Sequence, residues 1–173
     1  MNEEPYQSPR LVRDLMSVGV PTCALDDSVV DLTRWFLEKE IEGAVVLGEN
    51  GHGVGVVTRD QLVQAYARGD YEDLTAQDIL EAKVPQVPPD IPLAAAAQIM
   101  QDLGVRILFL THHAGGIEYP AAYISYKHLL RHLGARDEQE LRDLGIKAER
   151  ESPIDTFLRR RDEALQRARS QRR

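Results

Sequence analysis

Two pairs of histidines come nearest to a metal site by type and spacing. His128 and His132 are four residues apart in a segment that we expect to be helical, so their imidazoles would share one face and could chelate a metal ion. His112 and His113 fall in an expected loop. The pattern supplies no third ligand and no glutamate at the spacing of a zinc enzyme, so we expect solvated histidines and no metal.

Nucleophilic and acid–base chemistry have weaker support still. Cys23 is the single cysteine, has no histidine at a recognisable spacing, and is expected to be a small buried residue. The chain contains no Gly-x-Ser-x-Gly motif. Asp26 and Asp27 precede an expected helix, where carboxylates favour the positive end of the helix dipole without any catalytic role. We therefore expect a protein that is not an enzyme and requires no cofactor.

Size, composition and charge narrow the function classes further. A chain of 173 residues, 43% hydrophobic and 28% charged, has room for one compact domain or two small motifs, but not for a sensor plus a catalytic domain. Residues 1–10 contain no apolar run and no later stretch approaches a membrane span, so we expect a cytoplasmic protein. The net charge of -7 is unevenly spread: residues 153–173 carry +4, from seven arginines against three acidic residues, and the rest of the chain carries -11 and should repel nucleic acid phosphates.

An internal repeat is the strongest pattern in the sequence. At an offset of 64 residues, Val20-Pro21 falls on Val84-Pro85, and the apolar positions that follow keep the same register. After the expected loop at 112–116 the offset becomes 67, which places Thr58 on Ser125. An insertion of three residues in the loop explains the change, because loops tolerate insertions.

Both units predict the same order of elements: helix, strand, helix, strand, strand, helix. The longer helix of each unit has apolar residues at three- and four-residue spacing, which predicts one buried stripe; the stripes are Val29, Leu32 and Phe36, then Leu93, Ala96 and Met100. Two strands of the first unit flank an Asn50-Gly51 turn. We expect short leading helices at 11–16 and 75–80, strands at 43–47 and 53–57, and final helices at 59–67 and 126–133.

This order of elements, occurring twice at this length, resembles the CBS (cystathionine β-synthase type) domain family. The resemblance rests on RDLMSVGVPTCALDDSVVDL, EIEGAVVLGENGHGVGVVTRDQL, AQDILEAKVPQVPPDIPLAAAAQIM and GVRILFL with AAYISYKHLL. It implies an α/β fold of the α+β kind, in which pseudo-symmetric repeats at 11–68 and 69–133 pack sheet against sheet. A tail at 1–10 would precede them, a charged helical extension at 134–173 would follow, and such a pair, a Bateman module, commonly forms a homodimer.

The resemblance also implies a cleft between the repeats for an adenosine-containing ligand: AMP, ADP, ATP or S-adenosylmethionine. In the family, the first extended stretch and the start of the second strand hold the adenine, while the head of the last helix meets the ribose and phosphate. The matching positions are Val20, Pro21, Ile41, Glu42, Thr58, Asp60 and Gln61 in the first repeat, and Val84, Pro85, Val105, Arg106, Ser125, Lys127 and His128 in the second.

The chain departs from the family pattern at the ribose position. Gln61 and His128 stand where an aspartate is usual, although Asp60 lies one residue earlier, and both side chains can still hydrogen-bond a hydroxyl. Two interpretations stay open for the other polar residues. Thr58 and Gln61 also form a capping box, which alone explains both of them. Arg106 offers two donors to a phosphate, but a surface arginine at a strand start would look the same.

The C-terminal extension supports other functions. We expect a short charged helix at 136–144 and then, from Ser152 to about Ser170, an amphipathic helix with Arg159, Arg160 and Arg161 on its polar side. Its apolar stripe predicts docking on the acidic body or on a dimer mate. The arginines leave a partner protein or nucleic acid as the alternative, and the shortage of aromatics for base stacking makes nucleic acid the weaker one.

The leading interpretation is a regulatory, signal-transduction module. Binding of an adenine nucleotide or S-adenosylmethionine would shift the packing of the repeats and so control a separate partner. The altered ribose positions favour one alternative, a dimeric scaffold or interaction subunit without a ligand. The other alternative is a nucleic-acid-binding regulator that uses the Arg-rich tail. None of these three functions involves a membrane.

Overall fold

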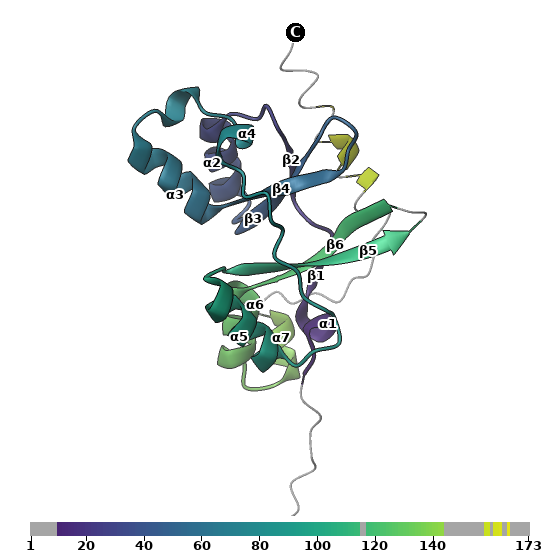
Figure 1. The fold of residues 1–173 in the computed structure, drawn as a ribbon. Helices are drawn as coiled ribbons and strands as arrows, with labels where there is room; N and C mark the ends of the chain where they lie inside the picture. Colours follow the sequence, from purple (N-terminus) through teal and green to yellow (C-terminus); the bar gives the residue numbers. More distant parts are fainter. Residues whose placement is uncertain (1–9, 115–116, 144–157, 160, 164–165, 167–173) are drawn as a thin grey trace, which may run out of the picture.

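The computed structural model describes residues 10–114, 117–143, 158–159, 161–163 and 166. In these ranges two small β-sheets face each other in the middle of the molecule, and helices cover the outer side of each sheet (Figure 1). The predicted fold class, α+β with two sheets packed against each other, is confirmed. No helix within the described ranges is long and apolar enough to span a bilayer.

The first sheet has three strands in the order β2 (Thr22–Ala24), β3 (Gly43–Leu47) and β4 (Gly53–Thr58). Strand β2 is parallel to β3, and β4 is antiparallel to it. The outer side carries α2 (Val29–Glu38), α3 (Arg59–Arg68), a 3-10 turn (Tyr71–Asp73) and α4 (Ala76–Ile79). The predicted stripe of α2 is buried here together with Cys23, and the Asn50-Gly51 turn forms as predicted, with Gly51 at a φ of 76°.

The second sheet has the order β1 (Ser17–Val18), β6 (Ile117–Ser125) and β5 (Ile107–Ala114), and neighbouring strands are antiparallel. Its outer side carries α1 (Val12–Leu15), α5 (Leu93–Leu103) and α6 (Tyr126–Gly134), followed by α7 (Glu138–Asp143). The predicted stripe of α5 is buried in the core beneath this sheet.

Strand pairing repeats between the two halves at the offset that the sequence shows. Thr22 of β2 pairs in parallel with Val45, and 64 residues later Gln86 forms a parallel bridge with Phe109. Only one bridge remains where the first sheet has a strand, because Pro88 stands at the position of Ala24, which pairs with Leu47 in β3, and lacks the N–H group that a longer ladder needs. The internal repeat is therefore a repeat of structure as well as of sequence.

The short leading helices are exchanged between the two halves. Helix α1 buries Val12 and Leu15 in the core of the second sheet, although it precedes the first sheet in the chain. Helix α4 buries Ala76 in the core of the first sheet. Two isolated bridges show the same exchange: Leu11, before α1, pairs with Pro92, before α5, and Thr75, before α4, pairs with Ser28, before α2. Each unit defined by sequence therefore contributes one helix to the packing of the other.

A third apolar cluster fills the space between the two sheets. Its buried members come from both sheets: Val20, Val45, Leu47, Val56, Ile107, Phe109, Tyr119 and Ala121. Gly55 permits a close approach at its edge, where Val56 and Glu81 exchange backbone hydrogen bonds of 2.9 and 2.8 Å. A Cβ atom at Gly55 would lie 2.6 Å from the Glu81 carbonyl oxygen, so any larger residue would push this bridge apart.

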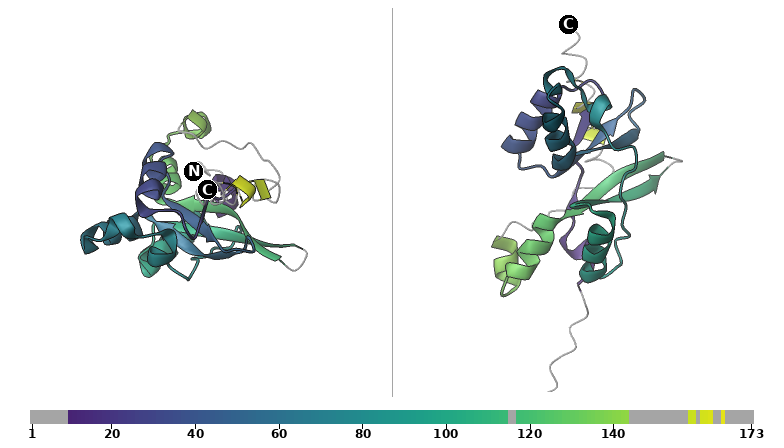
Figure 2. Two further views of the ribbon diagram at one scale, coloured as in Figure 1. Left: turned by 90° about the horizontal axis from the view of Figure 1, so that it is seen from above. Right: turned by 60° about the vertical axis from the view of Figure 1, so that its left-hand side comes forward.

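The hairpin of β5 and β6 corrects one prediction. His112 and His113 lie within β5 and not in a loop, paired with Tyr119 and Glu118 of β6. Both hairpins shift register at equivalent places, between Val46 and Leu47 and between Leu110 and Thr111, but β5 and β6 have 8 and 9 residues where β3 and β4 have 5 and 6. The longer hairpin projects from the side of the molecule (Figure 2).

One helix start agrees with the predictions and one differs. Asp26 and Asp27 precede α2 as predicted; Ser28 caps the helix, and Asp27 is buried with its carboxylate accepting from the Ala24 N–H at 2.9 Å. Helix α7 begins at Glu138 because the Asp137 carboxylate accepts the Glu140 N–H at 2.9 Å and so stops the helix from starting at 136. In the predicted amphipathic helix, only 158–159, 161–163 and 166 are described, and they are helical; the rest of that prediction lies outside the described residues.

Candidate functional site

An open cleft lies where the head of α3 meets the end of α5 and the start of β5. Its volume is 490 Å³, and it is lined by residues of both units: Glu42, Val56, Thr58, Arg59, Asp60, Gln61, Gln64, Glu81, Lys83, Pro85, Leu103, Gly104, Val105, Arg106 and Ile107. We call it the first cleft. It joins the helix-head residues predicted in the first repeat to the adenine-edge residues predicted in the second.

Thr58 and Gln61 build the helix end of the first cleft. The Thr58 backbone N–H donates to Gln61 Oε1 at 3.0 Å, Thr58 Oγ1 also contacts Gln61 Oε1, and Thr58 Oγ1 accepts the Asp60 N–H at 3.3 Å. This is the predicted capping box. The amide nitrogen of Gln61 takes no part in it and Gln61 lines the cleft, so the capping role and a binding role are compatible.

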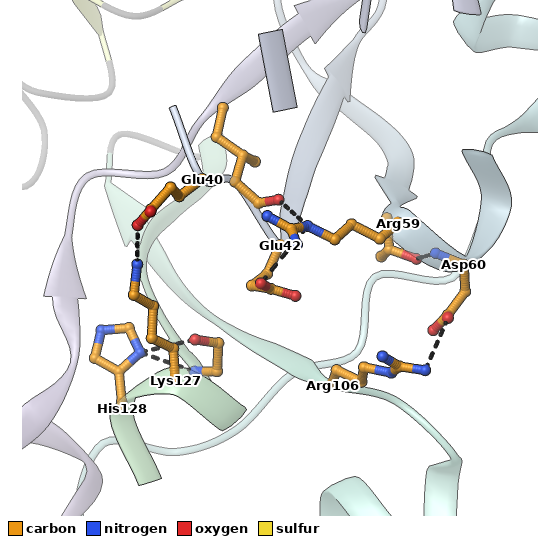
Figure 3. A network of polar contacts seen from close by, with 10 residues as sticks. Glu40, Glu42, Arg59, Asp60, Arg106, Lys127 and His128 are labelled. Atoms are coloured by element: carbon orange, nitrogen blue, oxygen red, sulfur yellow. Dashed lines mark hydrogen bonds and ion pairs between the residues drawn. The ribbon is translucent and has the colours of Figure 1, made fainter. Parts of the chain in front are cut away.

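An ion pair bridges the first cleft. Arg106 Nη2 lies 3.3 Å from Asp60 Oδ1, and the two side chains come from different units (Figure 3). Next to it, Arg59 Nε donates to the Ile41 carbonyl at 2.8 Å and lies 3.6 Å from Glu42 Oε1. Asp60 and Arg106 both keep large exposed fractions, 41% and 58%, so a ligand can reach both without opening the core.

The remaining wall of the first cleft is apolar. Val56 and Ile107 are buried at its floor, and Pro85 and Val105 are partly exposed beside them. A flat purine ring stacks well on such aliphatic surface, while the backbone of an extended segment offers donors and acceptors to its edge. Donors for a phosphate, carboxylates for ribose hydroxyls and an apolar floor therefore occur in one cavity.

The other predicted site residues are not gathered in one cavity. Val20 is buried between the sheets, and Val84 packs against the same cluster. Pro21 and Ile41 line a separate cavity of 300 Å³ with Tyr123, whereas Lys127 lines another of 720 Å³. Ser125 and His128 are buried, with exposed fractions of 1% and 5%. We call this divided region, which pseudo-symmetry relates to the first cleft, the second cleft.

His128 is used inside the fold. Its Nδ1 accepts the Ser125 N–H at 3.1 Å, so the neutral ring carries its proton on Nε2, which lies 2.9 Å from Ser17 Oγ. Burial, with smaller contributions from Arg131 and Lys127, lowers the pKa of His128 from 6.5 to about 4. A neutral ring with both nitrogens engaged does not chelate a metal ion with His132.

Several residues of the first cleft were missed at the sequence level. Gln64, Glu81, Lys83 and Gly104 line it, yet none belongs to the motif that the family resemblance marks. Gly104 had a usable signal, since a glycine after an apolar helical stripe predicts the left-handed C-cap observed here at a φ of 64°. Glu81 and Lys83 had none, because their placement depends on the exchange of α4.

Comparisons with known proteins agree with this architecture. Residues 12–68 match the family model of the CBS domain. The CBS domain pair of protein MJ0100, solved with 5'-methylthioadenosine and S-adenosyl-L-methionine, superposes with a TM-score of 0.63 at 18% identity, covering 75% of this chain and 100% of that one. A search of curated proteins gave no match.

Two further solved structures are similar. An uncharacterised conserved protein of Pyrococcus horikoshii gives a TM-score of 0.65 at 17% identity, covering 75% of this chain and 96% of that one. A putative signal-transduction protein with CBS domains from Burkholderia ambifaria gives 0.58 at 21% identity, covering 69% and 85%. At these identities the likeness establishes the fold.

Proposed function

Because residues 12–68 are a CBS domain and the described chain has the fold of a CBS domain pair, we propose that this protein is a regulatory module that binds one adenosine-containing ligand in the first cleft. The repeats would run over 11–68 and 69–133 with their leading helices exchanged. AMP, ADP, ATP and S-adenosylmethionine are the ligand candidates. The module is not an enzyme in this proposal and acts in the cytoplasm by controlling a partner protein.

The observation that carries the proposal is the composition of the first cleft. Thr58, Asp60 and Gln61 stand opposite Val105 and Arg106 around a cavity of 490 Å³, which is within the size of ordinary small-molecule sites. Protein MJ0100, which shares the fold, was solved with two adenosine compounds in complex with its CBS pair. That precedent supports an adenosine compound as the first class to test.

The ion pair across the cleft suggests how binding reaches the rest of the protein. Asp60 belongs to the head of α3 and Arg106 to the turn before β5, so the pair joins the two halves. A ligand whose hydroxyls bind Asp60 and whose phosphate or carboxylate binds Arg106 would break the direct ion pair between these two side chains. Each side chain would then contact the ligand instead. The distance between the two halves would then depend on the ligand, and a partner protein would bind one of the two arrangements more tightly than the other.

We also propose a homodimer, on the basis of two matching apolar faces. Val63 and Tyr66 of α3 are exposed by 67% and 70%, and Leu130 and Leu133 of α6, at the equivalent positions of the second repeat, by 63% and 80%. Two related faces of this kind suit the self-complementary contact of a two-fold dimer.

Thermal unfolding with AMP, ADP, ATP, NAD or S-adenosylmethionine tests the proposal. A ligand at about 100 times its Kd stabilises the folded state by about 2.7 kcal/mol, which raises Tm by roughly 5 to 10 °C for a chain of this size. For AMP, Arg106→Ala should reduce the rise by about half or more, while Arg13→Ala, which removes an exposed ion pair with Asp90, should keep it. No rise with any compound would refute the sensor and favour the ligand-free dimeric scaffold.

A further inference from the structure

At three pairs of equivalent positions the two clefts differ in the space that the side chain takes up. The wall of the first cleft has Gly104, Asp60 and Val56. The internal repeat places Glu40, Lys127 and Tyr123 at the same three positions of the second cleft. Each of these exchanges puts a larger side chain into the second cleft.

Glu40 is held in a costly backbone conformation. It has a φ of 51° and is the one non-glycine residue with positive φ within the described ranges, while its counterpart Gly104 has a φ of 64°. A non-glycine residue in this region is disfavoured and persists only where its surroundings hold it. A Cβ atom at Gly104 would meet no atom within 4 Å, so the first cleft is left open at the place where Glu40 brings in a carboxylate.

Lys127 supplies the contact that holds Glu40. The Lys127 ammonium donates a hydrogen bond to Glu40 Oε2 and forms an ion pair with it, across the gap between the two repeats (Figure 3). The hydrogen bond and the charge of Lys127 lower the pKa of Glu40 below its usual value, so the carboxylate stays ionised. In the first cleft the position of Lys127 holds Asp60, which cannot pair with a glycine side chain.

Tyr123 and His128 fill the deeper part of the second cleft. The Tyr123 ring lies edge-on to the His128 ring with their centroids 5.4 Å apart, and His128 bonds Ser17 on the neighbouring strand. The equivalent places in the first cleft hold the smaller Val56 and the side chain of Gln61, beside open volume. Glu40 lines both cavities of the second cleft, so the ion pair lies at the partition between them.

We propose that the Lys127–Glu40 ion pair is a latch that, with Tyr123, divides the second cleft, so that no single cavity joins Lys127 at the helix head to the adenine-edge residues Pro21 and Ile41 and each chain binds a single adenosine-containing ligand. The stoichiometry rests on the function proposed above, whereas the closure itself does not. Because Lys127 and Glu40 are exposed by 38% and 73%, the pair acts through the space that it occupies in the second cleft and not through its strength.

Isothermal titration with AMP and with S-adenosylmethionine tests the stoichiometry. The natural chain should bind one molecule of the better probe. The double variant Glu40→Gly/Tyr123→Val gives the second cleft two residues of the first and should bind a second molecule. The control Glu38→Ala, which removes an exposed ion pair with Lys39 at the end of α2, should not. Two molecules in the natural chain, or one in the double variant, would overturn the latch.

Thiol labelling tests the closure without a ligand. Thr58→Cys and Ser125→Cys place a thiol at equivalent helix caps of the two clefts, and Cys23, fully buried, is the slow internal reference. Ser125→Cys should react on the order of tenfold more slowly than Thr58→Cys, and the double variant should remove that difference. Equal rates in the natural background would overturn the latch, whereas failure of both probes to bind would overturn only the proposed function.

Discussion

Asp60 and Arg106 face each other across the first cleft with 3.3 Å between Oδ1 and Nη2, and each belongs to a different repeat. Because both side chains are largely exposed, water screens the pair and it adds little to the stability of the fold, at most about 1 kcal/mol. Its position matters more than its strength, since the pair is the charged contact that a ligand must meet on entering the cleft.

Removing the guanidinium should separate phosphate ligands from others. In Arg106→Ala, affinity for AMP should fall by roughly 10- to 100-fold, because a charge-assisted hydrogen bond contributes about 1.5 to 3 kcal/mol. Affinity for 5'-methylthioadenosine, which has no phosphate, should change far less. Isothermal titration measures both, with Arg34→Ala, an exposed partner of Asp31 on α2, as the control. Equal losses for the two compounds would contradict a phosphate contact.

The capping boxes at Thr58 and Thr75 separate the structural role of Thr58 from its binding role. Thr58→Ala and Thr75→Ala each remove a cap of the same kind, so each should lower the free energy of unfolding by about 1 kcal/mol. Thr75 does not line the first cleft. Ligand affinity should therefore fall in Thr58→Ala alone. Urea unfolding measures the stability of both variants, and isothermal titration measures their ligand affinity. Unchanged affinity in Thr58→Ala would mean that Thr58 acts only as a helix cap.

The close approach at Gly55 gives a stability prediction. Gly55→Ala places a Cβ atom 2.6 Å from the Glu81 carbonyl and should cost about 2 kcal/mol of unfolding free energy, because the backbone must shift. Gly134→Ala is the control, since a Cβ atom there meets nothing within 4 Å. Urea unfolding of both variants should show the loss only at Gly55, and a neutral Gly55→Ala would mean that the bridge to Glu81 is dispensable.

Burial of His128 makes stability depend on pH. Its pKa is about 4 in the folded protein against 6.5 when exposed, so the unfolded chain binds the extra proton between these values. Stability is therefore complete above pH 6.5 and declines as the pH falls towards 4, by a total of about 3 kcal/mol. His128→Gln should flatten the urea-unfolding profile in this window, while replacing the exposed His52 by Gln should not. An unchanged slope in His128→Gln would assign the pH dependence to other groups.

The apolar helix faces predict the oligomeric state. Tyr66→Glu/Leu133→Glu should convert a dimer into a monomer in sedimentation velocity, because each substitution buries a charge in the proposed interface. Val54→Glu, at an exposed apolar position on β4, should leave the dimer intact. A natural chain that sediments as a monomer at all concentrations would refute the dimer.

Periodicity predicted which face of each element is buried but not which neighbour covers it. The stripes of α2 and α5 and the turn at Gly51 follow from spacing and from glycine chemistry, and all three are confirmed. The exchange of α1 and α4 could not be predicted, because Val12 and Ala76 would be equally apolar in either core. His112 was predicted to lie in a loop because it is polar. It lies instead at the exposed end of β5, beyond the part of the strand that is buried in the core.

The site was predictable in its residues and not in its grouping. The motif placed Thr58 and Gln61 in the cleft between the repeats without saying which adenine-edge residues face them. The cavity that contains them is completed by Val105 and Arg106 of the other repeat. Equivalent positions in two repeats share a sequence pattern and so look equally suitable. Only packing shows that Glu40 and Tyr123 occupy the volume that Gly104 and Val56 leave open.

The exchange of the leading helices sets the order in which the chain can fold during synthesis. Val12 and Leu15 emerge from the ribosome early, yet their apolar partners lie on α5, β5 and β6, near the other end of the described chain. The first sheet likewise lacks part of its cover until α4 has been made. Neither half is a self-sufficient folding unit, so the nascent chain must keep these side chains exposed until β6 has been made, and a chaperone that shields them would raise the yield of native protein.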